Sequence, residues 1–193
     1  MRRTPSAHGL QFCSPCSILV EEGFARLPSV QKKCVTTPCG TYEGRSLPDG
    51  EKIVAVSIMR AGDSLLDAVR RAVPNVLVGK ILIQRDESDE QKRPVLLYSK
   101  VPQLKNKEVM LVDPMLATGG SACKAIQELI KQGASEENIL FLNVVSCPEG
   151  LQRIAKEYPK VRIVTAAVDS HLNDQKYIVP GVGDYGDRYY GTD

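Results

Sequence analysis

The chain has 193 residues, 42% of them hydrophobic, and a formal net charge of +2 at pH 7. This length fits one domain with a sizeable core, because a domain of this size buries roughly 70% of the surface of its unfolded chain. The near balance of charge excludes a large basic surface for nucleic acid and an acidic tail for a cationic partner, so a small-molecule substrate fits better.

The beginning of the chain carries little regular pattern. Residues 1–16 show neither helical nor strand periodicity, so we expect a poorly ordered segment there and one domain over residues 17–193. The spacing of apolar residues predicts a short helix from Ser17 to Leu27, followed by a strand from Lys33 to Thr37. A turn at Cys39-Gly40 indicates that this strand belongs to a hairpin.

Strands and helices alternate through the rest of the chain. Consecutive apolar positions, as in Ile53-Val54-Ala55-Val56, are typical of strands covered on both faces. We therefore predict an α/β fold, a mostly parallel central sheet flanked by helices, with ligands beyond the carboxyl ends of its strands. The expected strands are Lys52–Met59, Val76–Gln84, Val95–Lys100, Glu108–Val112, Asn138–Val145 and Val161–Val168, and the expected helices are Asp63–Val73, Ser121–Gln132 and Pro148–Glu157.

Location and cysteine chemistry follow from what the chain lacks. Its longest apolar runs are far shorter than the roughly 20 residues needed to cross a bilayer, so we expect a cytoplasmic protein with no membrane partner. Arg2 and Arg3 in an acid-free start weakly resemble a transit peptide, which keeps organelle import as an alternative. Without a secretory signal, the six cysteines are expected to be reduced thiols. Cys13, Cys16, Cys34 and Cys39 approach a zinc-ribbon spacing, but the helix expected between the two pairs disfavours zinc.

The most informative segment runs from an apolar strand through small residues into a helix. The strand ends in an acid, Asp113, and Thr-Gly-Gly-Ser leads into the helix that follows. Free N–H groups and the positive end of the helix dipole form an anion site there, to which Thr118 and Ser121 add hydroxyl donors. Thr-Gly-Gly-Ser alone could be only a capped connection, but an acid at a strand's end is poorly placed for a core and well placed for ribose hydroxyls. Neither a Walker loop nor Gly-x-Gly-x-x-Gly is present, which sets ATPase and dinucleotide sites aside.

This segment resembles the ribose-phosphate motif of type I phosphoribosyltransferases. Most members of that superfamily carry two adjacent acids where this chain has Asp113-Pro114. The single acid followed by Pro-Met-x-Ala-Thr-x-Gly-Ser is similar to the uracil-specific branch, the uracil phosphoribosyltransferases. The resemblance implies that Asp113 holds the ribose hydroxyls and that the donor-binding segment comprises Pro114, Met115, Leu116, Ala117, Thr118, Gly119, Gly120 and Ser121.

Two arginines are candidates for the diphosphate of the donor. Arg60-Ala61-Gly62 follows the first central strand, where a guanidinium can bind phosphate in bidentate fashion, although an arginine at a turn can also simply pair with a surface acid. In the family, this position binds the diphosphate, which implies that role for Arg60, Ala61 and Gly62. The charged stretch 84–93 is predicted to be a solvated hairpin. The resemblance, extended by Tyr98-Ser99-Lys100-Val101-Pro102, implies that this arm closes over the substrate and that Arg85 reaches the diphosphate.

The C-terminal stretch 177–192 contains four glycines, two acids and four tyrosines, three of them after Gly183. Glycines near a terminus usually indicate disorder, but the aromatic content favours a tight loop whose backbone groups bind a flat ligand. The stretch resembles the uracil-binding carboxyl terminus of uracil phosphoribosyltransferases. The implied uracil contacts come from Ile178, Gly183, Asp184 and Tyr185, with Asp184 also facing the donor and its metal. His171 could act as a general base, but the family pattern does not need a histidine there.

The resemblance, which extends from about Val20 to Thr192, implies a pyrimidine-salvage enzyme that makes UMP and diphosphate from uracil and phosphoribosyl diphosphate. Its implied catalytic residues are Arg60, Arg85, Asp113 and Asp184, and Mg²⁺ arrives with the donor rather than in an all-protein cage. A homo-dimer or homo-tetramer is expected, with GTP as a candidate activator. The alternatives are a phosphoribosyltransferase for another base, or a non-catalytic or bifunctional regulator that senses pyrimidines and binds RNA.

Overall fold

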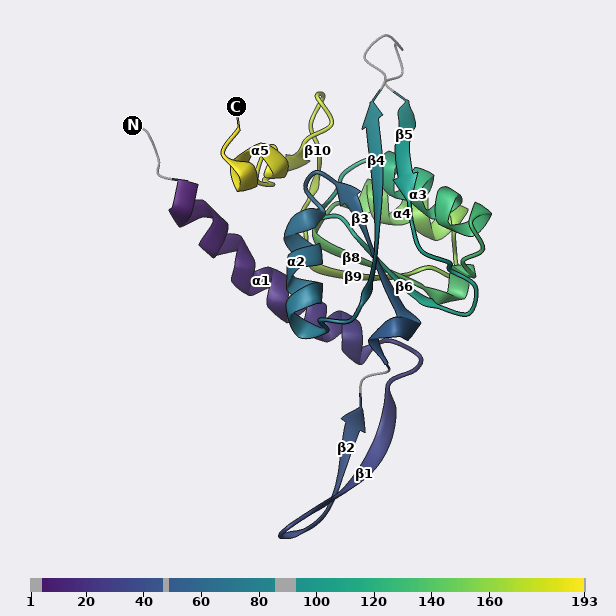
Figure 1. The fold of residues 1–193 in the computed structure, drawn as a ribbon. Coiled ribbons are helices and arrows are strands. Elements are labelled where there is room, and N and C mark those ends of the chain that lie inside the picture. Colours follow the sequence, from purple (N-terminus) through teal and green to yellow (C-terminus); the bar gives the residue numbers. More distant parts are fainter. Residues whose placement is uncertain (1–4, 47–48, 86–92, 193) are drawn as a thin grey trace.

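The computed structural model describes the backbone of residues 5–46, 49–85 and 93–192, and the side chains of 14–46, 49–84 and 93–192. The fold is a central sheet between two helical layers, from which one hairpin projects (Figure 1). The α/β architecture with a mostly parallel sheet is therefore confirmed.

The amino-terminal part forms a long helix and the projecting hairpin. Helix α1 (Pro5–Ala25) begins before the predicted start at Ser17, so the boundary expected after residue 16 falls inside a helix. Poor order of residues 1–16 and the division of the chain there stay predictions. The predicted hairpin is confirmed: β1 (Gln31–Thr37) pairs antiparallel with β2 (Gly40–Ser46).

The central sheet has seven strands, of which six follow the order β5-β4-β3-β6-β8-β7. The seventh, β9, also pairs with β8. All its pairings are parallel except that of β4 with β5. The strands are β3 (Ile53–Met59), β4 (Leu77–Arg85), β5 (Pro94–Lys100), β6 (Glu108–Val112), β7 (Met115–Leu116), β8 (Ile139–Ser146) and β9 (Arg162–Val168). Each strand predicted for this sheet is present, with its ends within one residue of the prediction. Of the seven strands of this sheet, only the two-residue β7 was not predicted.

The helices cover both faces of this sheet, as the uninterrupted apolar strands predicted. Helices α1 and α2 (Asp63–Ala72) lie on one face, and α3 (Gly120–Lys131) and α4 (Pro148–Glu157) on the other (Figure 1). Alternate residues of a strand serve the two layers, because successive side chains of a strand point to opposite faces. Thus Leu111 and Phe141 pack toward α3, whereas Met110 and Leu142 pack with α1 and α2. Short 3-10 turns precede β3 (Gly50–Lys52) and β8 (Glu136–Asn138).

The C-terminal stretch folds over the upper edge of the sheet in Figure 1. A small antiparallel pair, β10 (His171–Leu172) and β11 (Ile178–Val179), is followed by helix α5 (Tyr185–Tyr190). The prediction of a glycine-rich loop is therefore wrong for residues 185–190. Asp184 caps α5 by accepting a hydrogen bond of 2.9 Å from the backbone N–H of Asp187, and Gly191 ends the helix in a left-handed conformation.

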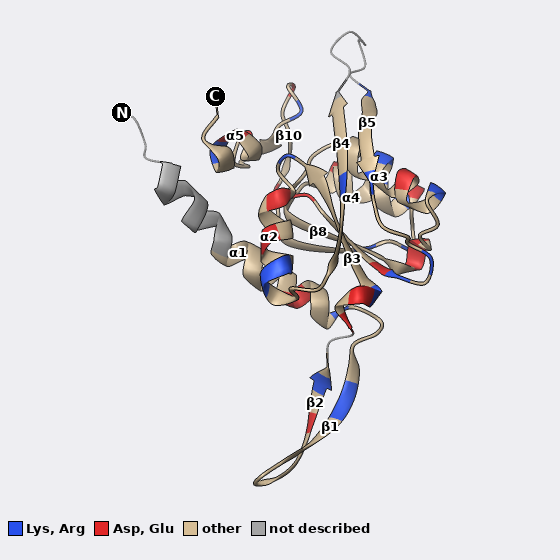
Figure 2. Cartoon of the chain, viewed as in Figure 1, with Lys and Arg blue, Asp and Glu red and all other residues tan. Residues whose placement is uncertain are grey.

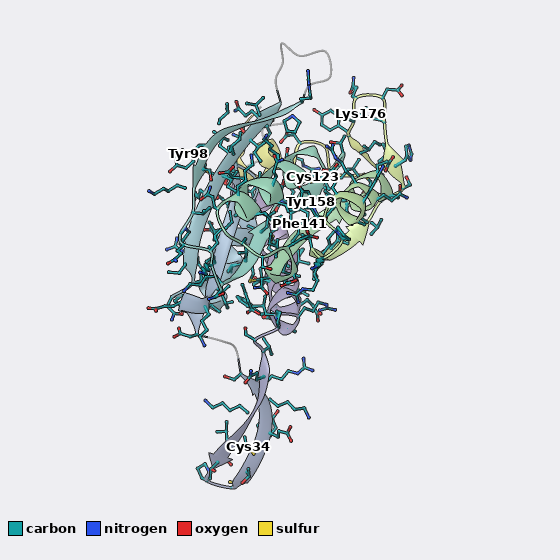
Figure 3. All side chains as sticks on the ribbon, turned by 90° about the vertical axis from the view of Figure 1, so that its right-hand side faces the viewer. Cys34, Tyr98, Cys123, Phe141, Tyr158 and Lys176 are labelled. Atoms are coloured by element: carbon teal, nitrogen blue, oxygen red, sulfur yellow. The ribbon has the colours of Figure 1, made fainter. Side chains whose placement is uncertain are left out.

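Basic and acidic residues are interspersed along the ribbon in the view of Figure 2. Within the described part of the chain, no helix is long and apolar enough to span a membrane. Phe141 lies inside the body and Cys34 lies far out on the projecting hairpin (Figure 3). Cys16 is buried in α1, whereas Cys34 and Cys39 are exposed free thiols.

Candidate active site

A cavity of about 580 Å³ opens beyond the carboxyl ends of the parallel strands, where ligands bind in open α/β sheets. The segments after β3 and β6 and the C-terminal stretch all contribute to its lining, so the three segments expected at the site do meet. The predicted site residues in the lining are Ala61, Asp113, Met115, Ala117, Ile178, Gly183, Asp184 and Tyr185.

Other predicted site residues lie outside this lining. The side chain of Arg85 falls outside the described residues, although its backbone closes β4. Four lining residues were not predicted: Gln84, Lys176, Tyr177 and Gly186. They follow from the positions of β4, the β10–β11 pair and α5 rather than from any motif. The predicted site residues that do not line the cavity are Arg60, Gly62, Pro114, Leu116, Thr118, Gly119, Gly120 and Ser121.

The phosphate-loop candidate runs from β7 into α3. Gly119 has a φ of 75°, which favours glycine, and α3 begins at Gly120, one residue before the predicted start. Thr118 Oγ1 accepts a long hydrogen bond of 3.4 Å from the N–H of Gly120. The amino-terminal end of this twelve-residue helix, a kind of end that favours anions, therefore follows closely on Ala117 of the cavity wall.

Arg153 of α4 lies beside the same loop. A Cβ atom on Gly119 would lie 3.4 Å from Arg153 Cδ, and one on Gly120 would lie 3.5 Å from Arg153 Nη1. Its Nε donates a hydrogen bond of 2.8 Å to Glu157. From sequence, Arg153 and Glu157 form an ordinary exposed i,i+4 pair, so no local signal predicted a cation next to the loop.

Asp113 is fixed by a buried polar network behind the cavity. Its carbonyl oxygen accepts a hydrogen bond of 3.1 Å from Nδ2 of Asn143, which is fully buried in β8. Asn143 Oδ1 accepts one of 2.8 Å from Thr165 of β9. Burial raises the pKa of the Asp113 carboxyl to about 7, although a weak hydrogen bond from the N–H of Met115 acts in the opposite direction. Burial thus favours the neutral form of this carboxyl in the cavity lining.

The loop after β3 packs directly against the strand that ends at Asp113. A Cβ atom on Gly62 would lie 2.4 Å from the carbonyl oxygen of Val112, so only glycine allows this approach. The first turn of α2 is anchored by Asp63, whose carboxylate accepts hydrogen bonds from Ser57 (2.7 Å) and Lys80 (2.9 Å). These contacts bind the loop to both β3 and β4.

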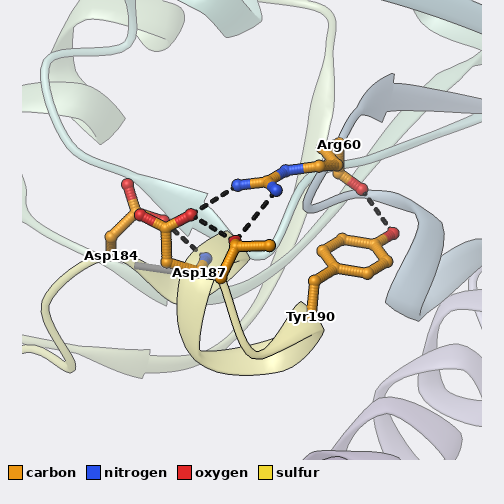
Figure 4. Close-up of polar contacts among 5 residues, drawn as sticks. Arg60, Asp184, Asp187 and Tyr190 are labelled. Carbon is orange, nitrogen blue, oxygen red and sulfur yellow. Dashed lines mark hydrogen bonds and ion pairs between the residues drawn. The ribbon is translucent and has the colours of Figure 1, made fainter.

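The guanidinium group of Arg60 does not line the cavity but faces the C-terminal helix. It forms an ion pair with Asp187 at 2.5 Å, and its guanidinium carbon lies 5.3 Å from the ring centroid of Tyr190 (Figure 4). The phenolic hydroxyl of Tyr190 donates a hydrogen bond of 2.9 Å to the carbonyl oxygen of Arg60. Sequence reasoning missed Asp187 and Tyr190 as neighbours of this loop, because the two segments are far apart along the chain.

The base-site candidate is held in place by Tyr185, which is 2% exposed. The Tyr185 hydroxyl donates a hydrogen bond of 3.1 Å to Ser64 Oγ. The Ser64 hydroxyl in turn donates one of 2.9 Å to the carbonyl oxygen of Ala61. The base segment and the loop after β3 are thus connected through α2. His171 is exposed and lies outside the cavity lining, with its Nδ1 2.8 Å from Ser170 Oγ, so its geometry does not favour a general-base role.

Comparison with known proteins agrees with this geometry. A family model described as uracil phosphoribosyltransferase matches residues 13–192. The uracil phosphoribosyltransferase of Dictyostelium discoideum is 47% identical over 178 residues, which cover 91% of this chain and 80% of that protein. That of Saccharomyces cerevisiae is 49% identical over 175 residues, with 90% and 79% covered.

Solved structures show the same fold. The AQ2163 protein from Aquifex aeolicus is 39% identical with a TM-score of 0.77, covering 91% of this chain and 81% of that one. A purine phosphoribosyltransferase from Pyrococcus horikoshii, at 16% identity and a TM-score of 0.54, shares the fold over 83% of this chain and 87% of that one. From the extent and identity of these matches, the chain belongs to the uracil phosphoribosyltransferase family.

Proposed function

We propose that the cavity is where this phosphoribosyltransferase joins uracil to the ribose of phosphoribosyl diphosphate, forming UMP and releasing diphosphate. The observation that carries this is the meeting of three segments at one edge of the sheet, each similar to a substrate-binding segment of the family. The match to the uracil-specific family, over residues 13–192, favours uracil over other bases.

The donor is proposed to lie across the two loops after β3 and β6. The 5'-phosphate would lie at the amino-terminal end of α3, where backbone N–H groups and the helix dipole favour an anion. Arg60 and Arg85 would neutralise the diphosphate as it leaves. Asp113 would accept hydrogen bonds from the ribose hydroxyls in its ionised form.

Uracil is proposed to lie against the C-terminal segment, where Ile178, Gly183, Asp184 and Tyr185 line the cavity. Backbone groups can match the alternating donors and acceptors of a pyrimidine edge without charged side chains. Cytosine would place an amino group where uracil has a carbonyl, leaving buried donors facing a donor, which is costly.

In the reaction, N1 of uracil forms the bond to C1' of the ribose as the bond from C1' to the diphosphate oxygen breaks, and the N1 proton leaves to solvent. The positive charge that develops on the ribose is stabilised by the Asp113 carboxylate. Contacts between the loop after β3 and the C-terminal stretch hold the two substrate-binding segments, and so the reactants, together. Asp113 and Asp184 both line the cavity, so their oxygens suit a hard cation. Mg²⁺ bound with the donor would supply further neutralisation of the diphosphate.

The test is UMP formation from labelled uracil by the purified chain, with magnesium and with competing bases. We expect turnover that requires a divalent cation and is unaffected by excess cytosine, hypoxanthine or orotate. Asp113→Asn is expected to lower kcat by about 10²-fold or more, as for other losses of a group that stabilises transition-state charge. Turnover near that of the unmodified chain in this variant would exclude the role given to Asp113.

A cytoplasmic location, a homo-dimer or homo-tetramer and activation by GTP are also proposed, with the family resemblance as their support. Light scattering of the purified chain and the same assay with and without GTP test the last two. Fractionation of cells expressing the full chain tests the first.

A further inference from the structure

The guanidinium group of Arg60 is already occupied by the C-terminal segment. Nη2 lies 2.5 Å from Asp187 Oδ1, and Nη1 donates a hydrogen bond of 3.0 Å to Thr192 Oγ1 (Figure 4). Thr192 Oγ1 donates one of 2.7 Å to the same Asp187 oxygen, so the three side chains form a closed ring of polar contacts. The two terminal nitrogens, which form one of the edges an arginine offers to a phosphate, are therefore in use.

This ion pair is suited to exchange. The side chains of Arg60 and Asp187 are 51% and 35% exposed, and pairs with this much exposure are weak and screened by salt. Hydrogen bonds from Thr192 and Arg60 hold the pKa of Asp187 below its usual value, so the carboxylate is an anion at neutral pH. Arg60 is thus paired with a charge that a more highly charged anion can replace.

The backbone around Arg60 is held by contacts that do not involve the guanidinium group. Tyr190 donates a hydrogen bond of 2.9 Å to the Arg60 carbonyl, and the bond between Tyr185 and Ser64 fixes the start of α5. The arginine side chain can therefore leave Asp187 while the loop and α5 stay in place.

Gly186 separates the guanidinium group from the cavity. A Cβ atom at this position would lie 3.3 Å from Asp184 Oδ1 and 3.7 Å from Arg60 Nη2. Gly186, Asp184 and Ala61 all line the cavity, so Arg60 lies directly behind its wall. Glycine here leaves no side chain between Arg60 and the cavity.

We propose that Asp187 is an internal competitor for the donor: its carboxylate holds Arg60 until the diphosphate of phosphoribosyl diphosphate replaces it. A diphosphate carries more negative charge and more acceptor oxygens than a carboxylate, which favours the exchange. After reaction the carboxylate returns to Arg60 and hastens release of the product diphosphate. The exchange presupposes the function proposed above, because it requires that Arg60 binds diphosphate.

The test compares Asp187→Asn with the unmodified chain. Asparagine keeps the shape and an acceptor oxygen but removes the charge. We expect Asp187→Asn to bind magnesium diphosphate about two- to five-fold tighter in calorimetric titrations without uracil, and to show a KM for the donor lowered by a similar factor. Asp67→Asn is the matched control, since Asp67 is an exposed acid of α2 that also acts electrostatically on Tyr190, and its effect should stay below about two-fold.

Unchanged or weaker diphosphate binding by Asp187→Asn overturns the exchange. Arg60→Gln separates this outcome from failure of the proposed function. If Arg60→Gln loses diphosphate affinity while Asp187→Asn gains none, only the exchange is wrong; if Arg60→Gln changes nothing, the diphosphate role of Arg60 is wrong as well. Should Asp187→Asn not fold, a crystal structure of the unmodified chain with magnesium diphosphate decides: an Arg60–Asp187 separation beyond about 4 Å supports the exchange, and an intact pair overturns it.

Discussion

The raised pKa of the Asp113 carboxyl makes the stability of the fold depend on pH. This pKa is raised from 3.8 to about 7 in the folded chain because burial disfavours the charged form. Between these two pKa values the folded state binds more protons than the unfolded state. The contribution of the protonated Asp113 carboxyl to the free energy of unfolding is therefore full below about pH 4 and is lost as the pH rises through about 7.

We therefore expect the difference in unfolding free energy between the unmodified chain and Asp113→Asn to fall by about 1.4 kcal/mol per pH unit between pH 5 and 7. Urea denaturation of both proteins at pH 5, 6, 7 and 8 measures this difference. A difference independent of pH would mean that the carboxyl is not buried in the folded state.

The hydroxyl group of Tyr185 joins the base segment to α2. Because this hydroxyl is buried and donates to Ser64, Tyr185→Phe is expected to lower the unfolding free energy by about 1 to 2 kcal/mol. Tyr177→Phe is the control, since Tyr177 is exposed and its change should stay within about 0.5 kcal/mol. Equal losses in both variants, measured by urea denaturation, would contradict a specific role for the Tyr185 hydroxyl.

The junction between β3 and α2 depends on close backbone approach rather than on unusual dihedral angles. Gly62 has a φ of −59°, which any residue can adopt, yet a Cβ atom there would lie 2.4 Å from the Val112 carbonyl and 2.7 Å from that of Ile58. Since both neighbours are backbone atoms, they cannot rotate away as a side chain can.

Gly62→Ala is therefore expected to destabilise the fold by about 1 to 3 kcal/mol and to raise the KM for the donor, because the loop must move away from Asp113. Gly120→Ala is the control for stability, since its Cβ atom would lie 3.4 Å from Pro94, an ordinary van der Waals contact. Thermal unfolding and steady-state kinetics measure both effects. A fully stable Gly62→Ala variant with unchanged kinetics would refute the packing argument.

The whole molecule separates into a packed body and the hairpin of β1 and β2. Every residue of β1 is exposed, and neither core cluster contains a residue of the hairpin. Gln31 pairs with Ser46, so the two ends of the hairpin are adjacent and a short linker can join them.

Replacing residues 31–46 with a short Gly-Ser linker is expected to change the unfolding free energy of the body by less than about 1 kcal/mol, because no core contact is lost and a short loop is cheap to close. Urea denaturation measures this value, and light scattering records any change in assembly. A loss above about 2 kcal/mol would show that the hairpin supports the body.

The amino-acid sequence by itself determined the long strands, α2 to α4 and the loop that leads into α3, since hydrophobic periodicity and small residues before a helix are local features. It also identified the family through the stretches around Asp113 and at the C-terminus, where Gly183 to Tyr185 line the cavity. It missed the early start of α1, the short strands and α5. Short elements depend on hydrogen bonds to distant parts of the chain, and the glycines around Asp184 favoured a loop rather than a helix capped by this residue.

Only the tertiary structure decided which partners each site residue meets. The pairing of Arg60 with Asp187 spans 127 positions in the sequence, and the bond between Tyr185 and Ser64 spans 121. The pKa of Asp113 is likewise raised by burial, which depends on the surrounding fold. Such contacts have no local pattern, because they depend on how the strands order in the sheet and on where the chain returns after β9. Hydrophobic periodicity along one segment indicates which of its faces is buried. Which residues of other segments pack against that face is decided only when the chain folds.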